Sequence, residues 1–563
     1  MNNLPQELVD KICSYLTIEE LKKVLLLTRQ FRYGAERFCG IYDNFDIEKR
    51  NAQEFVECFS GHRLSFLREL KFRPVLPPFQ EFDGNGKKPC RETADEVRKR
   101  DESFTKEIQW LFHILSLVED RPSEKQIIGR YRLSVYSPTR KFENRRVCPH
   151  HIVIGWRVRL LNIDLPLISS VQSFQIYNNY SKDTGFYFHH TYNGFKVPEL
   201  KLDLRILVDL ATRFPNLEYL GTRTGGFEWC EYWEKENHSP AKDYERDWPG
   251  LQRDTRHGFT SAVLSSYRKF PRSLQRAHLD FLNPLSRVLQ IHHAQPLPDL
   301  VAPFRNDLFS SSLRLLCQNL RFLQLRCIID ESIFLQEDGA VSIWPNLEQL
   351  DLMFHPARPN GTWYFHAADG RGSDSVGFPV TDAHYPPYKT TELDKEMDEL
   401  CEKGGYSIGY DDGMRFRTEP HKRLRPLLEG FAKAAIQMKQ LKEAVIWFPL
   451  ILDSETTLHG GELLELRDPE WDRAWSITYT ESSCPIFPGA SRRLEWRTAP
   501  WRPDPELHRL YQQIGRSKLG DELEEIWQPF PRDDEEEWSD LEDLAKGIFD
   551  KDPGCISPTS ATF

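Results

Sequence analysis

The sequence has no long hydrophobic run, no secretory signal pattern and no closely spaced pair of cysteines. The longest apolar stretch, AVIWFPLIL at 444–452, is too short to cross a bilayer and is interrupted by Pro449. The first residues lack the basic segment followed by an apolar one that marks a signal peptide. The eleven cysteines are an odd number without a CxxC pair, which favours reduced thiols over a disulfide framework. We therefore expect an intracellular protein, cytoplasmic or nuclear or both, without a membrane partner.

The minimal motifs of several enzyme classes are also missing. The sequence contains no GxxxxGK[ST], no GxGxxG, no GxSxG and no HExxH. Histidines occur as neighbours in CPHH at 148–151, in His189-His190 and in His292-His293, but none lies at zinc-finger spacing. Adjacent residues of a strand also point to opposite faces, so such pairs do not converge on one ion. We expect a non-catalytic protein with no metal site and no cofactor, and an enzyme is the least favoured alternative.

Positive charge is outnumbered by negative charge along the chain. Lys and Arg total 74 against 85 Asp and Glu, a formal net charge of −11, and such a surface repels phosphate backbones. Nucleic acid is therefore not an expected partner. At 563 residues the chain is several times the commonest domain size, so we expect more than one structural unit.

Apolar residues at helical spacing fill LPQELVDKICSYLTIEELKKVLLLTRQFR at 4–32. Pro5 suits the first turn of a helix, and TIEE at 17–20 is a capping box that begins a second one. Leu26 and Leu27 add apolar surface around that second helix, so a single neighbour would leave some of it exposed. A unit of roughly 40 residues buries too little surface alone, so its apolar faces should meet another domain or another protein.

This stretch resembles an F-box in its Leu-Pro opening, in Glu7-Leu8, and in Arg29 placed two residues before Phe31. The resemblance covers about the first 45 residues, under a tenth of the chain. In that family the three-helix unit docks on the adaptor Skp1 and so joins a cullin-RING ubiquitin ligase. The alternative is an amphipathic helical hairpin packed on its own protein. The resemblance assigns Skp1 binding to Leu4, Pro5, Leu8, Ile12, Leu16, Leu21, Val24 and Leu25.

The body of the chain contains two nearly identical segments, FPNLEYLGT at 214–222 and WPNLEQLDL at 344–352. Looser relatives start at 273, 319 and 440, and the shared form is xxLxxLxL. The leucines of such a unit point one way from a short strand, while Glu348, Gln349 and Asp351 stay in solvent. The two segments are therefore predicted to be neighbouring or near-neighbouring parallel strands of one sheet, with four interior leucines, namely Leu217, Leu220, Leu347 and Leu350.

These segments resemble leucine-rich repeats, although their spacing is irregular. The equivalent leucines lie 57, 46, 27 and 94 residues apart, namely Leu217, Leu274, Leu320, Leu347 and Leu441. Degenerate repeats with large insertions are the expected form, as in F-box proteins of filamentous fungi, which the chain resembles overall. The alternative is a chance recurrence of leucine in an unrelated α/β domain. The predicted fold class is α/β, with a three-helix F-box at 1–45 followed by an irregular leucine-rich-repeat-like solenoid at 46–500.

Two insertions interrupt the predicted solenoid. The polar segment 80–103 is expected to be a solvated loop that enters a helix. The segment 355–391 mixes Gly and Pro with aromatic residues, which supply rigid recognition area when they are exposed on a loop. The alternative is that these aromatics attach the loop to its own scaffold. The candidate target-binding residues are Trp363, Tyr364, Phe365, Phe378 and Tyr385.

The C-terminal part is predicted to close the solenoid. Residues 501–528 include a helix from Pro503 to Gly515 whose apolar face would cover the last repeat. Residues 529–563 are acidic and then rich in Ser, Thr and Pro, so a mostly mobile tail is expected.

Taken together, the patterns predict the substrate-recognition subunit of a Skp1-cullin-F-box type ubiquitin ligase. Skp1, and through it a cullin, would bind the N-terminal unit, and an unknown protein substrate would bind the repeats. The alternative is a Skp1-bound interaction scaffold without ubiquitin transfer.

Overall fold

The computed structural model describes most of the chain in segments. These are 4–77, 93–120, 130–140, 157–177, 202–224, 255–282, 293–294, 296–336, 340–341, 344–381, 392, 416–449, 474–481, 492–498 and 501–528. The predicted acidic tail at 529–563, Tyr385 and most of the 80–103 insertion lie outside the described residues.

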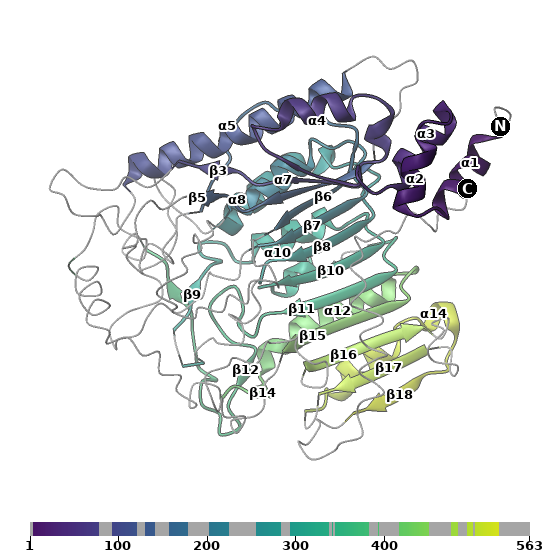
Figure 1. Cartoon of the computed structure of the whole chain (residues 1–563). Helices are drawn as coiled ribbons and strands as arrows, with labels where there is room; N and C mark the ends of the chain where they lie inside the picture. The colour runs from purple at the N-terminus through teal and green to yellow at the C-terminus, as the bar shows by residue number, and fades with distance from the viewer. Residues whose placement is uncertain are drawn as a thin grey trace, which may run out of the picture.

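A 12-stranded sheet organises the molecule, and its strands follow one another in chain order (Figure 1). Neighbouring strands are parallel from β1 to β15, whereas β16 runs antiparallel to both β15 and β17. The sheet contains β1 (Asn44–Ile47), β2 (Glu69–Phe72), β4 (Tyr131–Tyr136), β6 (Val171–Tyr177), β7 (Tyr219–Arg223), β8 (Arg276–Asp280), β10 (Phe322–Cys327), β11 (Gln349–Phe354), β15 (Glu443–Pro449), β16 (Ala474–Glu481), β17 (Arg492–Arg497) and β18 (Glu524–Trp527).

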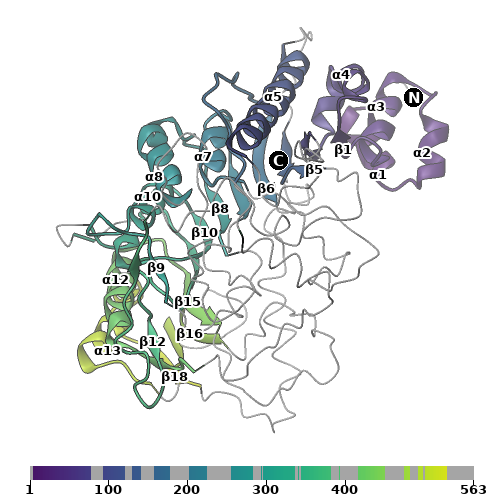
Figure 2. The ribbon, with the colours of Figure 1, turned by 90° about the vertical axis from the view of Figure 1, so that its left-hand side faces the viewer.

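The helices between these strands lie on one face of the sheet, as Figure 2 shows for α5, α7, α8, α10 and α12. The described α-helices are α1 (Gln6–Ser14), α2 (Ile18–Val24), α3 (Arg29–Phe38), α4 (Ala52–Phe59), α5 (Ala94–Glu119), α7 (Arg205–Ala211), α8 (Thr255–Ser266), α10 (Leu308–Leu316), α12 (Arg425–Gln437), α13 (Pro505–Gln512) and α14 (Arg516–Leu519). Short 3₁₀ helices are η1 (His62–Ser65), η4 (Tyr267–Lys269), η5 (Glu331–Ile333) and η8 (Lys422–Leu424). Three two-stranded pairs lie outside the main sheet, formed by β12 (Phe365–His366) with β14 (Glu419–Pro420), β13 (Phe378–Pro379) with β9 (Pro298–Asp299), and β3 (Val75–Leu76) with β5 (Thr139–Arg140).

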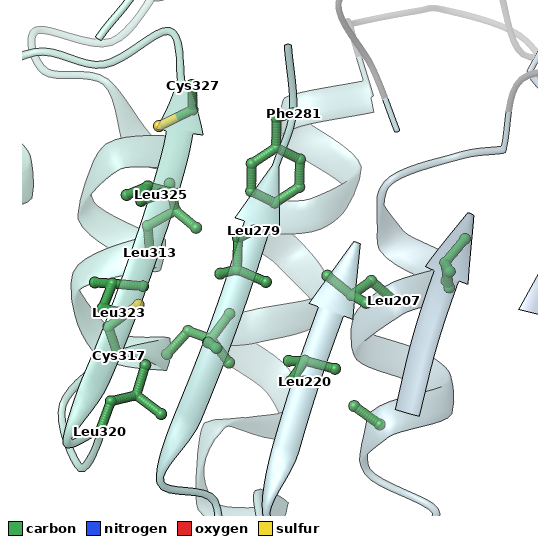
Figure 3. Close-up of a cluster of buried hydrophobic side chains, with 14 of the residues drawn as sticks. Leu207, Leu220, Leu279, Phe281, Leu313, Cys317, Leu320, Leu323, Leu325 and Cys327 are labelled. Carbon is green, nitrogen blue, oxygen red and sulfur yellow. The ribbon is translucent and has the colours of Figure 1, made fainter. Parts of the chain in front are cut away.

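Alternation along the strands places the core between the sheet and its helices. In β10, for example, Leu323, Leu325 and Cys327 are buried while the residues between them are only partly covered. Figure 3 shows these side chains facing leucines of neighbouring strands and of α7 and α10. One continuous apolar cluster of this kind extends from Ile47 in β1 to Ile514 after α13. Burial of this shared cluster is the main source of stability for strands that share no local contacts.

The same turn precedes five of the parallel strands. In each one a buried leucine donates its N–H to the carbonyl three residues earlier, as Leu347 does to Trp344 and Leu320 to Cys317. The strand begins two residues after that leucine in all five cases. The next N–H then donates to the equivalent carbonyl of the preceding strand, as Glu348 does to Arg321 and Lys442 to Glu348. The five leucines are Leu217, Leu274, Leu320, Leu347 and Leu441.

The predictions for the two nearly identical segments are therefore confirmed. Both lead into parallel strands of one sheet, β7 and β11, separated by β8 and β10, and all four predicted interior leucines are buried. The irregular spacing in sequence does not disturb the register, because the extra residues fall between the strands in the sequence and not within them.

Two expectations need correction. The segment 80–103 is not all loop, because α5 begins at Ala94, where Thr93 accepts from the Glu96 N–H and the Glu96 carboxylate accepts from the Thr93 N–H in a capping box. Glu348 is not a freely solvated side chain either. It accepts hydrogen bonds from Arg321 on one neighbouring strand and from Lys442 on the other, and it is only 13% exposed.

The C-terminal helix is shorter than predicted but closes the core as expected. It spans Pro505–Gln512 with Asp504 as its N-cap, and Leu507, Tyr511 and Ile514 are buried. One further strand, β18, pairs with β17 and forms the last edge of the sheet. Among the described residues, none of the helices has the length and apolar character needed to cross a membrane.

Candidate functional site

The three N-terminal helices form a small unit with its own core. Val9 and Cys13 of α1, Leu21 of α2, and Phe31 and Ala35 of α3 are buried together. The local sequence sets each boundary, because Thr17 caps α2 in the predicted capping box and Thr28 caps α3 by accepting from the Phe31 N–H.

A second apolar surface of this unit is left uncovered, which we call the N-terminal apolar stripe. On α1 it follows helical spacing through Leu8, Ile12 and Tyr15, which are 49%, 41% and 78% exposed. It continues through Ile18, Leu26 and Leu27, and Leu26 is 90% exposed. Solvent-exposed apolar side chains gathered on one small unit are typical of a docking surface.

The residues assigned to Skp1 by resemblance divide into three groups by exposure. Leu8 and Ile12 lie in the exposed stripe and Pro5 is exposed. Leu21 is buried in the unit's own core, so its assignment to a partner contact is wrong. The remaining four, Leu4, Leu16, Val24 and Leu25, are partly buried and pack against the same core. Sequence periodicity missed Val9 and Cys13 as the inward residues of α1. Their face of the helix is displaced by only one residue from the face of Leu8 and Ile12, which the sequence analysis selected.

The N-terminal unit is attached to the first turn of the sheet through a buried carboxylate. Arg63 in η1 donates through Nε and Nη2 to the two oxygens of Glu36 in α3, at 3.0 and 2.6 Å. His62 Nε2 lies 3.0 Å from the same carboxylate, and the Tyr33 ring meets Phe66 edge-on at 5.0 Å. Burial acts to raise the pKa of Glu36, but the hydrogen bonds from Arg63 and His62 outweigh it and hold that pKa below its ordinary value. The contact fixes α3 against the body.

The face of the sheet opposite the helices is lined mainly by polar and aromatic residues. Around the centre of the sheet, Arg276 lies over the Phe322 ring at 4.8 Å and Arg321 approaches the same ring at 5.6 Å. Arg276 and Phe322 are partly exposed and Gln349 is exposed beside them. Arginine and aromatic side chains are the types that contribute most to protein interfaces.

The aromatic residues predicted to bind a target do not form a free surface. Trp363, Tyr364 and Phe365 are fully buried. Trp363 belongs to a second apolar cluster on the polar face of the sheet, with Met353 of β11 and Trp447 of β15. The Tyr364 hydroxyl donates to the Ile329 carbonyl at 2.9 Å. The prediction is wrong for these three residues, because they anchor the 355–381 segment to its own scaffold.

Phe378 is partly buried and pairs through β13 with β9, so it also belongs to the scaffold. The exposed residues of the segment include Val376 and the charged Asp369, Arg371 and Asp374.

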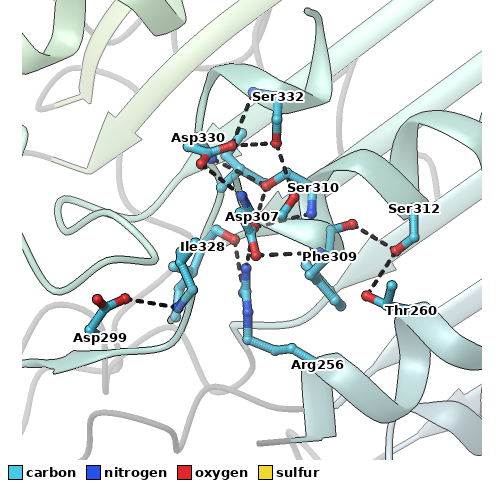
Figure 4. Close-up of polar contacts among 12 residues, drawn as sticks. Arg256, Thr260, Asp299, Asp307, Phe309, Ser310, Ser312, Ile328, Asp330 and Ser332 are labelled. Carbon is cyan, nitrogen blue, oxygen red and sulfur yellow. Dashed lines mark hydrogen bonds and ion pairs between the residues drawn. The ribbon is translucent and has the colours of Figure 1, made fainter. Parts of the chain in front are cut away.

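A buried polar cluster joins α8, α10 and η5 (Figure 4). Arg256 donates to the Asp307 carboxylate and to the Ile328 carbonyl. Asp307 caps α10 by accepting from the N–H groups of Phe309 and Ser310. Asp330 accepts from the Ser332 N–H at 3.0 Å and from the Asp307 N–H at 3.3 Å. Both carboxylates thus serve backbone groups, which assigns the cluster a structural role.

The cluster is titratable, because burial, then the Asp307 charge and then the Glu331 charge raise the pKa of Asp330 to about 7. A carboxyl group whose pKa is raised in the folded state stabilises the fold fully below its unfolded pKa, near 4. That contribution is lost as the pH rises through about 7.

Asp330→Asn is expected to make the protein less sensitive to pH between 5 and 8. The amide resembles the protonated acid, so it removes the ionisation that destabilises the fold at high pH. We compare the free energy of unfolding of the variant with that of the wild type at each pH. This difference should favour the variant more at pH 8 than at pH 5, by about 1 to 3 kcal/mol. Urea unfolding at the two pH values measures this difference, and equal wild-type and variant slopes with pH would contradict it.

Within the described residues, no group of three or more His, Cys, Asp and Glu side chains is placed to hold a metal ion. Comparison with known proteins adds nothing further to these geometric observations, since neither a protein-family model nor a curated protein matches the chain.

Proposed function

We propose that the chain is the substrate-recognition subunit of a Skp1-cullin-F-box type ubiquitin ligase. The N-terminal unit binds a Skp1-type adaptor, the adaptor joins a cullin, and the sheet holds the protein that is to be ubiquitinated. The chain itself performs no chemistry in this proposal, because its contribution is to keep the target close to the transferring enzyme.

The observation that carries the proposal is the N-terminal apolar stripe on a unit whose sequence resembles an F-box. A stripe that includes Leu8, Ile12 and Leu26 is costly to leave in water and is expected to be covered by a partner. The unit has its own core and a fixed attachment through Glu36 and Arg63, so covering the stripe does not require it to unfold.

The in-register parallel strands support the second half of the proposal. The repeated leucine turn and the helices on one face resemble a leucine-rich-repeat solenoid with large insertions. We assign target contact to the polar face where the central strands begin, because Arg276, Phe322 and Gln349 are the first residues of β8, β10 and β11 and are at least partly exposed. This assignment replaces the aromatic residues of the 355–391 segment.

The first test is adaptor binding by the double variant Leu8→Lys/Ile12→Lys. Both side chains are exposed, so the unit keeps its core, but two charges enter the proposed interface. We expect the affinity for a recombinant Skp1-type adaptor to fall by at least about 100-fold, measured by calorimetry, because hot-spot losses of this kind exceed 2 kcal/mol. Leu4 and Pro5 are poorer choices, because Leu4 packs on the core and Pro5 is the N-cap of α1, where its ring restricts φ to the observed −56°.

The matched control is Leu264→Lys on α8, where a leucine is 52% exposed far along the chain from the stripe. It makes the same chemical change and should leave adaptor affinity unaltered. Wild-type affinity in the double variant, with its helical content intact, would refute adaptor docking at the stripe. Adaptor binding without turnover of any bound target in cells would favour the scaffold alternative.

A further inference from the structure

The 355–381 segment and residues 416–424 carry a group of basic side chains, of which Arg417 is buried, and we call this group the cationic cluster. The backbone brings them together through the antiparallel pair β12 and β14, extended by hydrogen bonds from the Thr418 N–H to the His366 carbonyl and from the His421 N–H to the Tyr364 carbonyl. The cluster consists of Arg371, Arg417, His421, Lys422 and Arg423.

Among the residues that the structure describes, no carboxylate forms an ion pair with the three arginines of the cluster. Arg417 donates instead to backbone carbonyls of His293, Phe365 and Gly372. The Arg371 guanidinium lies 3.8 Å from the centre of the Phe416 ring. Arg423 has a buried Nη1 without a hydrogen-bond acceptor among its neighbours.

The nearby carboxylates are engaged elsewhere or lie at the edge. Glu331 pairs with Arg358, and Asp369 accepts from the backbone N–H of Arg371. Asp374 is exposed and acts on Arg423 and His421 only through its charge. Glu419 in β14 is partly exposed and makes no ion pair within the described part of the chain.

Burial and neighbouring positive charges lower the pKa values of two arginines of the cluster. Burial first, and then the charges of Arg423 and Arg371, lower the pKa of Arg417 to about 10. Burial and the Arg358 charge likewise lower the pKa of Arg423. Arg425, only two residues further on, shows the opposite shift, since hydrogen bonds from its guanidinium to Asp504 raise its pKa. Positive charge is therefore compensated at Arg425 and uncompensated in the cluster.

The cluster is also held rigidly. Gly372 has φ +81°, and a Cβ at this position would lie 2.6 Å from Arg417 Nη1, so the guanidinium packs flat against its backbone. His421 Nδ1 accepts from the Arg423 N–H at 3.1 Å. Burial, followed by the charges of Arg423 and its neighbours, lowers the pKa of His421 to about 4, so the ring is neutral and carries its proton on Nε2.

We propose that the cationic cluster binds a phosphate monoester. Arg371 and Arg423 present guanidinium donors that match phosphate oxygens two at a time, Lys422 adds a point charge, and His421 adds the Nε2 donor. Arg417 acts as a positioning residue by fixing the loop that carries Arg371. A dianion fits better than a carboxylate, because several fixed cations lie together and the single negative charge of Asp374 does not balance them. Two sources carry this chemistry, a phosphorylated protein side chain and a small phosphate metabolite.

The proposal does not depend on adaptor docking, because the cluster is remote in sequence from the N-terminal unit and involves none of its residues. If the receptor function also holds, the cluster makes target recognition sensitive to phosphorylation. A failure of phosphate binding leaves the adaptor test above unaffected, and a failure of adaptor binding leaves this site unaffected.

The test is phosphate binding to the full chain. Inorganic phosphate should raise the melting temperature with saturation, whereas equal ionic strength of chloride should not. Arg371→Gln and Arg423→Gln should each weaken phosphate binding about tenfold or more, because each removes charge-assisted hydrogen bonds. Arg425→Gln is the matched control, since it removes one positive charge two residues away from Arg423 and should leave the affinity unchanged.

Two peptides of identical sequence, with and without phosphoserine, then separate the sources. Binding of the phosphorylated peptide at least tenfold tighter than inorganic phosphate supports a phosphorylated side chain, and equal affinities support a small phosphate. No saturable effect of inorganic phosphate on the wild type would overturn the site. Equal weakening by Arg371→Gln and Arg425→Gln would also overturn it, because the effect would then reflect net charge alone. Circular dichroism checks that the variants are folded. Because Arg371 is exposed, Arg371→Gln should fold normally and still tests the site if Arg423→Gln folds poorly.

Discussion

Leu350→Ala is expected to lower the free energy of unfolding by about 2 to 5 kcal/mol. Leu350 is 2% exposed and faces the helices in the middle of the sheet, with Leu323 of β10 and Ala444 of β15 as its register partners. Strands on both sides hold its surroundings in place, so the cavity left by the lost atoms has little freedom to collapse. Urea unfolding followed by circular dichroism measures the loss.

The neighbouring residue on the same strand provides the control. Gln349→Ala changes an exposed side chain on the same strand and should shift the free energy of unfolding by no more than about 0.5 kcal/mol. Comparable losses at the two positions would mean that the leucine side of the strand is not the buried side, which would contradict the sheet architecture.

Glu348 illustrates how a position in a repeat acquires a role that its pattern does not show. Hydrogen bonds from Lys442 and then from Arg321 lower the pKa of Glu348. The stability that ionised Glu348 contributes to the fold is present above the ordinary carboxyl pKa and is lost as the pH falls through the lowered pKa. Exposed ion pairs are each worth about 0 to 1 kcal/mol, so Glu348 contributes modestly rather than nothing.

The repeat pattern was readable in sequence because a turn of fixed geometry needs a leucine at a fixed place. Leu217 and Leu347 are buried at equivalent positions of two such turns, and a strand starts two residues after each leucine. The number of strands was not readable, because β1, β4 and β6 lack the leucine motif although they pair in the same sheet. Those strands are set by pairing with neighbours distant in sequence, which a local pattern does not record.

Helix phase limited the prediction at the N-terminus. Leu8 and Ile12 share one face of α1, and Val9 and Cys13 share the next, and both faces are apolar. Periodicity shows that both faces avoid water but does not say which one meets α2 and α3. The structure buries Val9 and Cys13, and this leaves the face with Leu8 and Ile12 exposed.

The aromatic loop failed as a predicted site for a similar reason. Aromatic residues serve equally as interface contacts and as anchors, and composition does not separate the two. Trp363 is buried beneath Arg417, whose guanidinium lies 4.4 Å from its ring centre. The site that we propose on this segment therefore rests on its cations and not on these aromatics.

Arg256→Met is expected to destabilise the protein by about 3 to 5 kcal/mol at neutral pH. Arg256 is the cation paired with Asp307 in the buried polar cluster, and its side chain also holds the Ile328 carbonyl at 2.9 Å. Removing it leaves the carboxylates of Asp307 and Asp330 buried close together, and like charges out of water repel strongly. Chemical unfolding at pH 7 measures the loss.

The pH dependence of this loss distinguishes lost charge compensation from lost packing. Without Arg256, the folded state should take up a proton on the carboxylate pair more readily, so the loss should be smaller at pH 5 than at pH 8. Arg321→Met is the matched control, because it breaks the surface pair with Glu348 and should cost no more than about 1 kcal/mol. A loss for Arg256→Met that is the same at pH 5 and pH 8 would show that the arginine acts through its packing over Phe309, whose ring centre lies 4.2 Å away, rather than by neutralising the carboxylates.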